Sequence, residues 1–504
     1  MATIKSIFTS STNIIPKIVE LVRDDIGIVS LELERILREY LNNLRTDISA
    51  YIEYPYVDKV YRDSYYKYYS TKHYPYSRNC IRVALFEPSF TEDKLNSSEY
   101  YDELVKSYLG FFVIRPIPLH YWGRCILKPT AFLNSNFICC LTEISSSIKG
   151  FKLNVGAFPH TSQDSETYSC AETTIWEMME YFGTRYPEYK PILPSRILDT
   201  LSRYSYERQV PSGGLTSIQI SYVLKAFDFG TKIYDKGVQT EYPNDFKRIV
   251  AYYIESGIPI IASIVNPSNY KGHAIILIGR EIDIESRIEH IEPTYTITNV
   301  NGENLRIIDS ADIEKDYVII DDNHSPYKKA KLDSITNYYS ESDSDFRSME
   351  LINIIVPLYP KIYSEATQAR RTILNILKAF DLPFENEIVI RLFLTSSRSF
   401  KSEIIMDDKF DVALNRVIID IGMPKFVWVC ELSDKSLFKD NKSKGLIVLD
   451  ATDGFSRISL IFILLPNSLL INRDGELIVI NISFNNFSYF KNNLKGDWCG
   501  WRTK

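Results

Sequence analysis

The stretch Gln163-Asp-Ser-Glu-Thr-Tyr-Ser-Cys170-Ala-Glu-Thr-Thr-Ile-Trp-Glu-Met-Met-Glu-Tyr-Phe182 sets a cysteine at the start of a predicted helix. The apolar residues of this helix fall on one face, namely Ala171, Ile175, Met178, Met179 and Phe182. The helix therefore begins at Ser169–Cys170, where its dipole and its free N–H groups favour a thiolate. Because the thiolate is the nucleophilic form, this position suits covalent catalysis. Alternatively, Cys170 is an ordinary small residue that is buried at the start of the helix and has no catalytic role.

A candidate general base follows 103 residues later in the chain. The run Gly272-His273-Ala-Ile-Ile-Leu-Ile-Gly279 predicts a strand that is bounded by glycines and begins with a histidine. An imidazole at the start of an otherwise apolar strand suits a base that reaches the sheet edge while the strand anchors it. A core histidine with satisfied hydrogen bonds is the alternative.

A candidate for the residue that orients this imidazole comes 48 residues after His273. In Tyr317-Val-Ile-Ile-Asp321-Asp322-Asn323-His324-Ser-Pro326-Tyr327 a predicted strand ends in two carboxylates and an amide. Such a group can fix the imidazole tautomer by bonding its distal nitrogen. Asp321 is the first choice, and Asp322 and Asn323 stay open because register at a strand end is hard to predict. A simple turn is the alternative, since Asp, Asn and Pro favour turns.

The composition excludes several classes of protein. The chain has 504 residues, enough for two to four domains, and 45% of them are hydrophobic, which excludes wholesale disorder. Its net charge of −6 gives no support for a nucleic-acid binder. The seven cysteines are scattered and form no CxxC pair, so we expect neither a disulfide framework nor a structural zinc site. No metal and no other cofactor is predicted.

The changes in composition and periodicity along the chain predict an α+β protein in three parts. Residues 1–150 form a helical and tyrosine-rich α+β module, 151–360 carry the candidate site, and 361–504 form a C-terminal α+β module. Helical spacing over 18–50 is followed by a tyrosine-rich segment at 51–76, taken as a packed amphipathic helix rather than a nucleic-acid-stacking surface. The acidic, serine-rich segment 333–350 predicts a solvated loop and is a candidate lid over the Asp321 turn.

The ordered set of motifs between about 150 and 360 resembles the papain-like cysteine peptidase superfamily. The likeness is closest to the branch of bacterial peptidases that process bacteriocins with double-glycine leaders. It rests on Gln163 before Ser169-Cys170-Ala171, on Gly213-Gly214 before a helix, on Glu255-Ser-Gly257-Ile-Pro259-Ile-Ile-Ala-Ser before a strand, on Gly272-His273, and on the Asp321 turn. The match spans about 200 of the 504 residues.

The resemblance implies a papain-like central domain, with helices packed on an antiparallel sheet, and a Cys170–His273–Asp321 triad. It also implies that Gln163 and the N–H of Cys170 form an oxyanion hole. Two departures stand out: Gln163 lies seven residues before Cys170 where the family commonly has six, and Ala171 stands where this branch often has glycine.

The function predicted from these features is a cysteine peptidase that cleaves a peptide, isopeptide or amide bond in a protein or peptide substrate. Two alternatives stay open, an acyl transferase with the same triad and a non-enzymatic scaffold with a degenerate peptidase domain. We expect no membrane or nucleic-acid partner, and the flanking modules are candidates for binding a regulator or an oligomeric partner. Without a recognisable signal peptide or membrane span, a cytoplasmic location is expected.

Overall fold

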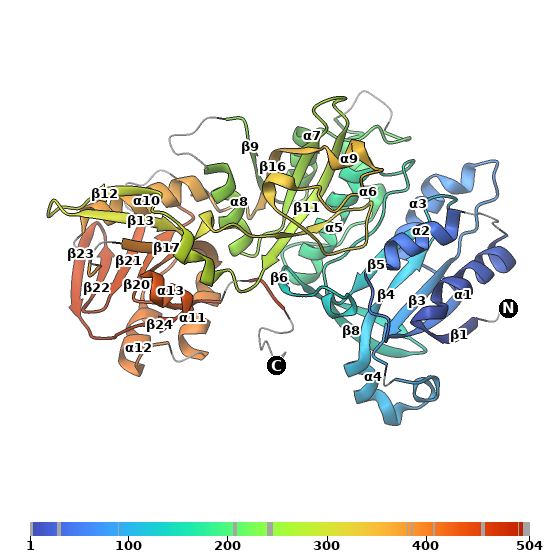
Figure 1. Cartoon of the computed structure of the whole chain (residues 1–504), viewed down its shortest axis with the longest axis horizontal. Coiled ribbons are helices and arrows are strands. Elements are labelled where there is room, and N and C mark those ends of the chain that lie inside the picture. Colours follow the sequence, from blue (N-terminus) through green and yellow to red (C-terminus); the bar gives the residue numbers. More distant parts are fainter. Residues whose placement is uncertain are drawn as a thin grey trace.

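The protein has a mixed α+β fold built on three large sheets, which lie along the long axis of the molecule (Figure 1). The computed structural model describes residues 4–27, 32–88, 90–204, 209–238, 245–380, 382–384, 387–406, 409–454, 459–491 and 493–496. No helix within these ranges combines the length and the apolar character needed to cross a membrane.

The N-terminal sheet is antiparallel and runs in chain order. Its strands are β1 (Lys5–Ser10), β2 (Ser49–Tyr56), β3 (Cys80–Phe86), β4 (Tyr108–Ile114) and β5 (Trp122–Leu127). Its helices are α1 (Ile14–Leu21), α2 (Glu32–Leu41), α3 (Lys59–Lys67) and α4 (Tyr101–Ser107). The hairpin of β7 (Thr142–Ile148) and β8 (Phe151–Ala157) shares a core with this sheet and crosses the expected limit at residue 150.

The helices predicted at 18–50 and 51–76 differ from the structure, because β2 occupies the junction between them. Strand β2 pairs with β1 on one side and β3 on the other. Its two faces enter different cores, since Ala50 and Ile52 pack in one and Tyr51 in the other. Burial on both faces with two pairing partners outweighs helical spacing. From α3 onward the tyrosine-rich segment packs inward only in part, since Tyr61 and Tyr69 are buried whereas Tyr66 and Tyr74 are exposed.

The central sheet positions the candidate site. Its order is β15 (Lys328–Ala330), β14 (Tyr317–Ile320), β11 (Gly272–Glu281), β10 (Ile260–Val265), β16 (Glu350–Leu358) and β9 (Gly230–Asp235), with β6 (Phe137–Cys139) also paired to β11. All these pairings are antiparallel. Strand β6 can approach because residue 279 is glycine, where an added Cβ would lie 2.1 Å from the carbonyl oxygen of Ile138.

Four of the described helices in the central part of the chain precede β10. They are α5 (Cys170–Arg185), α6 (Pro194–Leu201), α7 (Ser217–Ala226) and α8 (Asp245–Glu255). The helix predicted to begin at Ser169–Cys170 is confirmed as α5, and the helix predicted after Gly213–Gly214 is confirmed as α7. Helix α5 packs on β11, so the cysteine helix and the histidine strand are direct neighbours.

The third sheet draws strands from two parts of the chain. Its order is β12 (Tyr295–Thr298), β13 (Asn304–Asp309), β17 (Glu387–Ser396), β18 (Phe426–Ser433), β20 (Gly445–Asp450), β21 (Leu460–Leu465), β22 (Ser468–Arg473) and β23 (Glu476–Asn481). Its helices are α10 (Ala366–Ala379), α11 (Ser397–Met406), α12 (Val412–Asp420) and α13 (Lys435–Lys439). Strands β12 and β13 come from the expected central part, so this sheet crosses the expected limit at residue 360.

Candidate active site

Cys170 is the first residue of α5 and is half-buried. Ser169 precedes it as the N-cap, and the Glu172 carboxylate accepts hydrogen bonds from the Ser169 N–H (3.1 Å) and hydroxyl (2.6 Å). The other oxygen of Glu172 accepts a bond from the Ser212 hydroxyl at 2.7 Å. The capping box thus fixes the start of the helix and ties it to the loop that leads into Gly213–Gly214.

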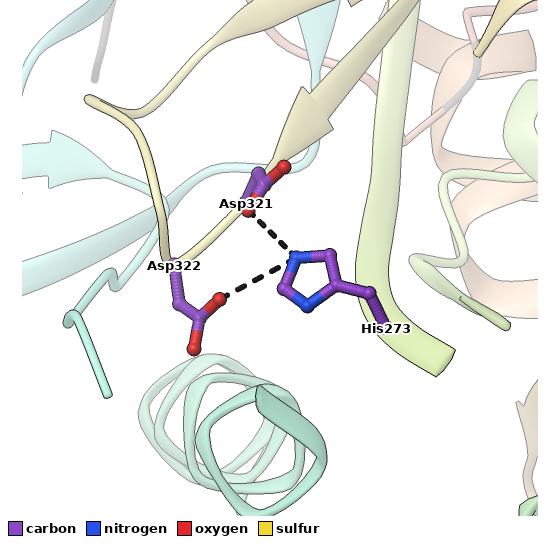
Figure 2. A group of neighbouring side chains, drawn as sticks. All are labelled: His273, Asp321 and Asp322. Atoms are coloured by element: carbon purple, nitrogen blue, oxygen red, sulfur yellow. Dashed lines mark hydrogen bonds and ion pairs between the residues drawn. The ribbon is translucent and has the colours of Figure 1, made fainter. Parts of the chain in front are cut away.

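His273 lies at the start of β11, and the register of the sheet brings it to Asp321. Because β11 and β14 are antiparallel, with Ile276 opposite Ile320, the start of β11 lies beside the end of β14. The Nε2 atom of His273 lies 2.9 Å from Oδ1 of Asp321 (Figure 2). Both side chains are buried.

His273 also interacts with Cys170. In Figure 2 Nδ1 points away from both aspartates, on the side of the helix at the bottom of the view. Burial lowers the pKa of His273, but the charges of Asp321 and Cys170, together with side-chain hydrogen bonds to both, raise it well above its usual value. The structure therefore brings Cys170, His273 and Asp321 together around one imidazole.

Asp321 is held as a carboxylate by four hydrogen bonds. Besides His273, its Oδ1 accepts the backbone N–H of Asn323 at 3.0 Å. Its Oδ2 accepts the hydroxyls of Tyr338 and Tyr339 at 2.8 and 2.7 Å. Burial raises the pKa of Asp321, but the charge and hydrogen bond of His273 outweigh it and hold the pKa well below the usual range. An ionised Asp321 is the form that can stabilise an imidazolium.

Residues 332–349, here called the strap, lie over this pair. The sequence predicts a solvated loop, and this is wrong for the aromatic residues, although the acidic residues 341–345 are exposed. The Phe346 ring stands edge-on to the His273 ring at 5.4 Å, and the Tyr339 ring stacks on Phe346 at 5.1 Å. Three aromatic residues within a polar segment thus cover the buried dyad.

Asp322 and Asn323, the alternative orienting residues, occupy different positions. Oδ1 of Asp322 lies 3.6 Å from Nε2 of His273, farther than Asp321. Burial is the main cause that raises the pKa of Asp322 to about 7. The charge of His273 opposes this rise, and the charge of Asp321 adds to it. The Asn323 side chain instead accepts a bond from Nε2 of Gln163 at 3.1 Å and donates one to the Tyr339 hydroxyl. Gln163 therefore lies beside the Asp321 turn.

Residues of the N-terminal module support the site, and sequence reasoning missed them. Arg115, which follows β4, donates to the carbonyl of Gln163 at 3.0 Å and to the Tyr168 hydroxyl at 2.5 Å. Tyr40 of α2 donates to the carbonyl of Asp322 at 3.0 Å. No motif marks these residues, because each contact joins segments that only the tertiary fold brings together.

A second buried polar pair, also missed, lies near Asp322. Nδ1 of His160 is 2.9 Å from Oε1 of Glu177, which also accepts the N–H of Thr161. Burial lowers the pKa of His160 to about 4 and raises that of Glu177 well above its usual value. The charge of Glu177 also raises the pKa of Asp322, so the two carboxyl groups interact.

Comparison with known proteins gives no family for this chain. No model of a protein family matches the sequence, and a search of curated proteins finds no match. Functional inference therefore rests on the geometry of the site.

Proposed function

We propose that this chain is a cysteine peptidase of the papain-like kind, which cleaves a peptide or amide bond with Cys170, His273 and Asp321. The observation that carries the proposal is the arrangement around one imidazole, which is hydrogen-bonded to Asp321 through Nε2 and interacts electrostatically with Cys170. The element order supports it, because a helix beginning with the cysteine packs on an antiparallel sheet whose adjacent strands carry the histidine and the acid.

The proposed reaction has two halves. His273 takes the proton of Cys170, and the sulfur attacks the carbonyl carbon to give a tetrahedral oxyanion. As the intermediate collapses, the imidazolium gives that proton to the leaving amine, and a thioester remains on Cys170. A water molecule, deprotonated by His273, then attacks the thioester and releases the acid and the thiol. Asp321 holds the tautomer and balances the imidazolium charge in both halves.

Two donors are proposed for the oxyanion, the backbone N–H of Cys170 and the side chain of Gln163. The first lies at a helix N-terminus, where N–H groups lack helical partners. The amide of Gln163 carries two donor protons, and its bond to Asn323 uses one of them. Arg115 and Tyr168 brace the loop between Gln163 and Cys170, which keeps the two donors in a fixed relation.

The broader setting also follows from this proposal. The proposed enzyme acts in the cytoplasm on a protein or peptide substrate. The modules at 1–150 and 361–504 are then available to bind a regulator or a second copy of the chain. The likeness to the bacteriocin-processing branch concerns the central part of the chain. An acyl transferase would share every step up to the thioester and differ only in the nucleophile that resolves it.

Labelling with iodoacetamide tests the proposed nucleophile. Burial raises the pKa of the thiols of Cys80, Cys125, Cys140 and Cys430, so these residues should react slowly. We expect Cys170 to be alkylated first in the native protein, as located by peptide mass spectrometry. A Cys499→Ala background removes the thiol that lies outside the described residues.

The control is the same experiment on Cys170→Ala and on His273→Ala. Cys170→Ala should lose the fast phase of labelling, and His273→Ala should slow it. Equal labelling of the wild type and Cys170→Ala would overturn the proposal and favour the non-enzymatic scaffold. A thioester that is resolved by an added amine in preference to water would identify an acyl transferase.

A further inference from the structure

Asp322 is a buried carboxylate to which the proposed reaction gives no role. Only 1% of its surface is exposed, and neither oxygen has a hydrogen-bond partner among the described residues. Its Oδ1 points at Nε2 of His273 from 3.6 Å (Figure 2). A buried carboxyl group without a hydrogen-bond partner is costly, and its oxygens are available to a ligand beside the imidazole.

Asp322 completes a set of three atoms that could bind a metal. Nε2 of His273 and one oxygen each from Asp321 and Asp322 lie within 4.8 Å of one another. Nε2 is 2.9 Å from one oxygen and 3.6 Å from the other. A tetrahedral zinc ion with bonds of about 2.0–2.2 Å separates its ligand atoms by about 3.4 Å. Small side-chain shifts therefore suffice to form the site.

The surroundings fit a cation. Three buried carboxyl groups, those of Asp321, Asp322 and Glu177, lie near one another, and within the described ranges no Lys or Arg forms an ion pair with any of them. Asp321 is itself hydrogen-bonded by Tyr338 and Tyr339, as the ligands of metal sites usually are.

We propose that His273, Asp321 and Asp322 bind one divalent transition-metal ion, with Zn²⁺ as the best fit to an imidazole and two carboxylates. This ion would occupy the Nε2 side of the ring, and the thiol of Cys170 is not among the atoms that could hold it. The site therefore differs from one that uses the thiol.

Bound metal would switch off the proposed peptidase, and this consequence rests on the proposed function. A neutral imidazole has one nitrogen with a free lone pair and one with a proton. When the metal takes the lone pair of Nε2, the ring proton resides on Nδ1, and an imidazolium would release its second proton to solvent. Nδ1 then cannot accept the proton of Cys170.

Isothermal titration calorimetry of the full, metal-stripped chain with zinc chloride tests the site. We expect one Zn²⁺ per chain, and binding at least about tenfold weaker in Asp322→Asn. Cys170→Ser should bind zinc as tightly as the wild type, because the thiol is not one of the proposed ligands. Glu177→Gln is the matched control, since it removes a nearby buried carboxyl group that is not a ligand, and its affinity should stay within about threefold.

Three results would each overturn the metal site: wild-type affinity in Asp322→Asn, loss of binding in Cys170→Ser, or equal weakening in Glu177→Gln and Asp322→Asn. Circular dichroism checks that the variants are folded, and Asp321→Asn, which removes another ligand, replaces Asp322→Asn if that variant is not. Calorimetry needs no turnover. A chain that binds zinc through Asp322 but lacks a reactive Cys170 would therefore overturn the proposed function alone.

Discussion

At the scale of single residues, a substitution of Asp321 can distinguish the effect of its negative charge from the effect of its side-chain shape. Asp321→Asn keeps the volume of the side chain but removes the negative charge that raises the pKa of His273. We expect the pKa of His273 to fall and peptide turnover to drop by about 10²–10⁴-fold. The pH profile of Cys170 alkylation measures the first effect, and a turnover assay on a peptide substrate measures the second.

Asp321→Glu, which keeps the charge, is the matched control and should retain more activity than Asp321→Asn. An unchanged alkylation profile in Asp321→Asn would contradict the proposed role of this carboxylate.

The same pair predicts how stability depends on pH. The folded pKa of Asp321 is below its unfolded value near 3.8, so its contribution is present above that value and is lost as pH falls through the folded pKa. The folded pKa of His273 is above 6.5, so its contribution is full below 6.5 and is lost as pH rises through the folded pKa. Thermal unfolding of the wild type and Asp321→Asn should therefore differ most between these limits, and a constant difference across pH would contradict the ion pair.

At the scale of elements, the strap links the dyad to a surface segment through two phenols. Tyr338→Phe and Tyr339→Phe each leave Asp321 short of one hydrogen bond. Because this acceptor is buried, we expect each change to cost about 1–3 kcal/mol of unfolding free energy. Urea unfolding measures the loss, and hydrogen exchange of residues 332–349 should become faster in the double variant.

Tyr363→Phe is the control for the strap, because Tyr363 is 60% exposed and lies elsewhere. A loss in Tyr338→Phe no larger than in Tyr363→Phe would show that the phenol contacts add nothing to stability.

The helix and the strand that carry Cys170 and His273 could be predicted from the sequence. The residues that contact and orient the His273 side chain could not. The apolar residues identify α5 and β11. The one-sided burial expected for the helix is wrong, because residues 171–182 are buried on every face, and nearly the whole strand is buried as well. The choice among Asp321, Asp322 and Asn323 needed the β11–β14 register, which the sequence does not encode locally. Tyr339 and Phe346 lie in a segment whose composition is that of a solvated loop, so only the fold reveals that they pack on His273.

At the scale of the whole molecule, Glu255 links the central sheet to the third sheet through ion pairs. This buried residue ends α8 and bonds to Arg280 of β11. Arg391 of β17 reaches the same carboxylate at 3.4 Å and Glu431 of β18 at 2.6 Å. Because these buried charges come from both sheets, losing any one of them should destabilise the interface between the sheets.

Glu255→Gln should destabilise the interface between the two sheets. Removing one partner of a buried ion pair leaves the others uncompensated, so we expect a loss of about 3–5 kcal/mol in unfolding free energy near pH 7. Burial raises the pKa of Glu255, but Arg280 and Arg391 outweigh it and hold the pKa at about 2. The contribution is therefore present above the unfolded value of 4.5 and is lost as pH falls toward 2. Urea unfolding at several pH values measures both effects.

Glu289→Gln is the matched control, because Glu289 pairs with Lys439 at the surface, where both side chains are largely exposed. Water and salt screen such an exposed pair, so this variant should unfold almost as the wild type does. The gap between wild type and Glu255→Gln should close between pH 4.5 and pH 2, since protonation then removes the same charge that the substitution removes. A gap that stays constant through this range would mean that Glu255 acts through packing, and that the two sheets are joined by apolar contact rather than by charge.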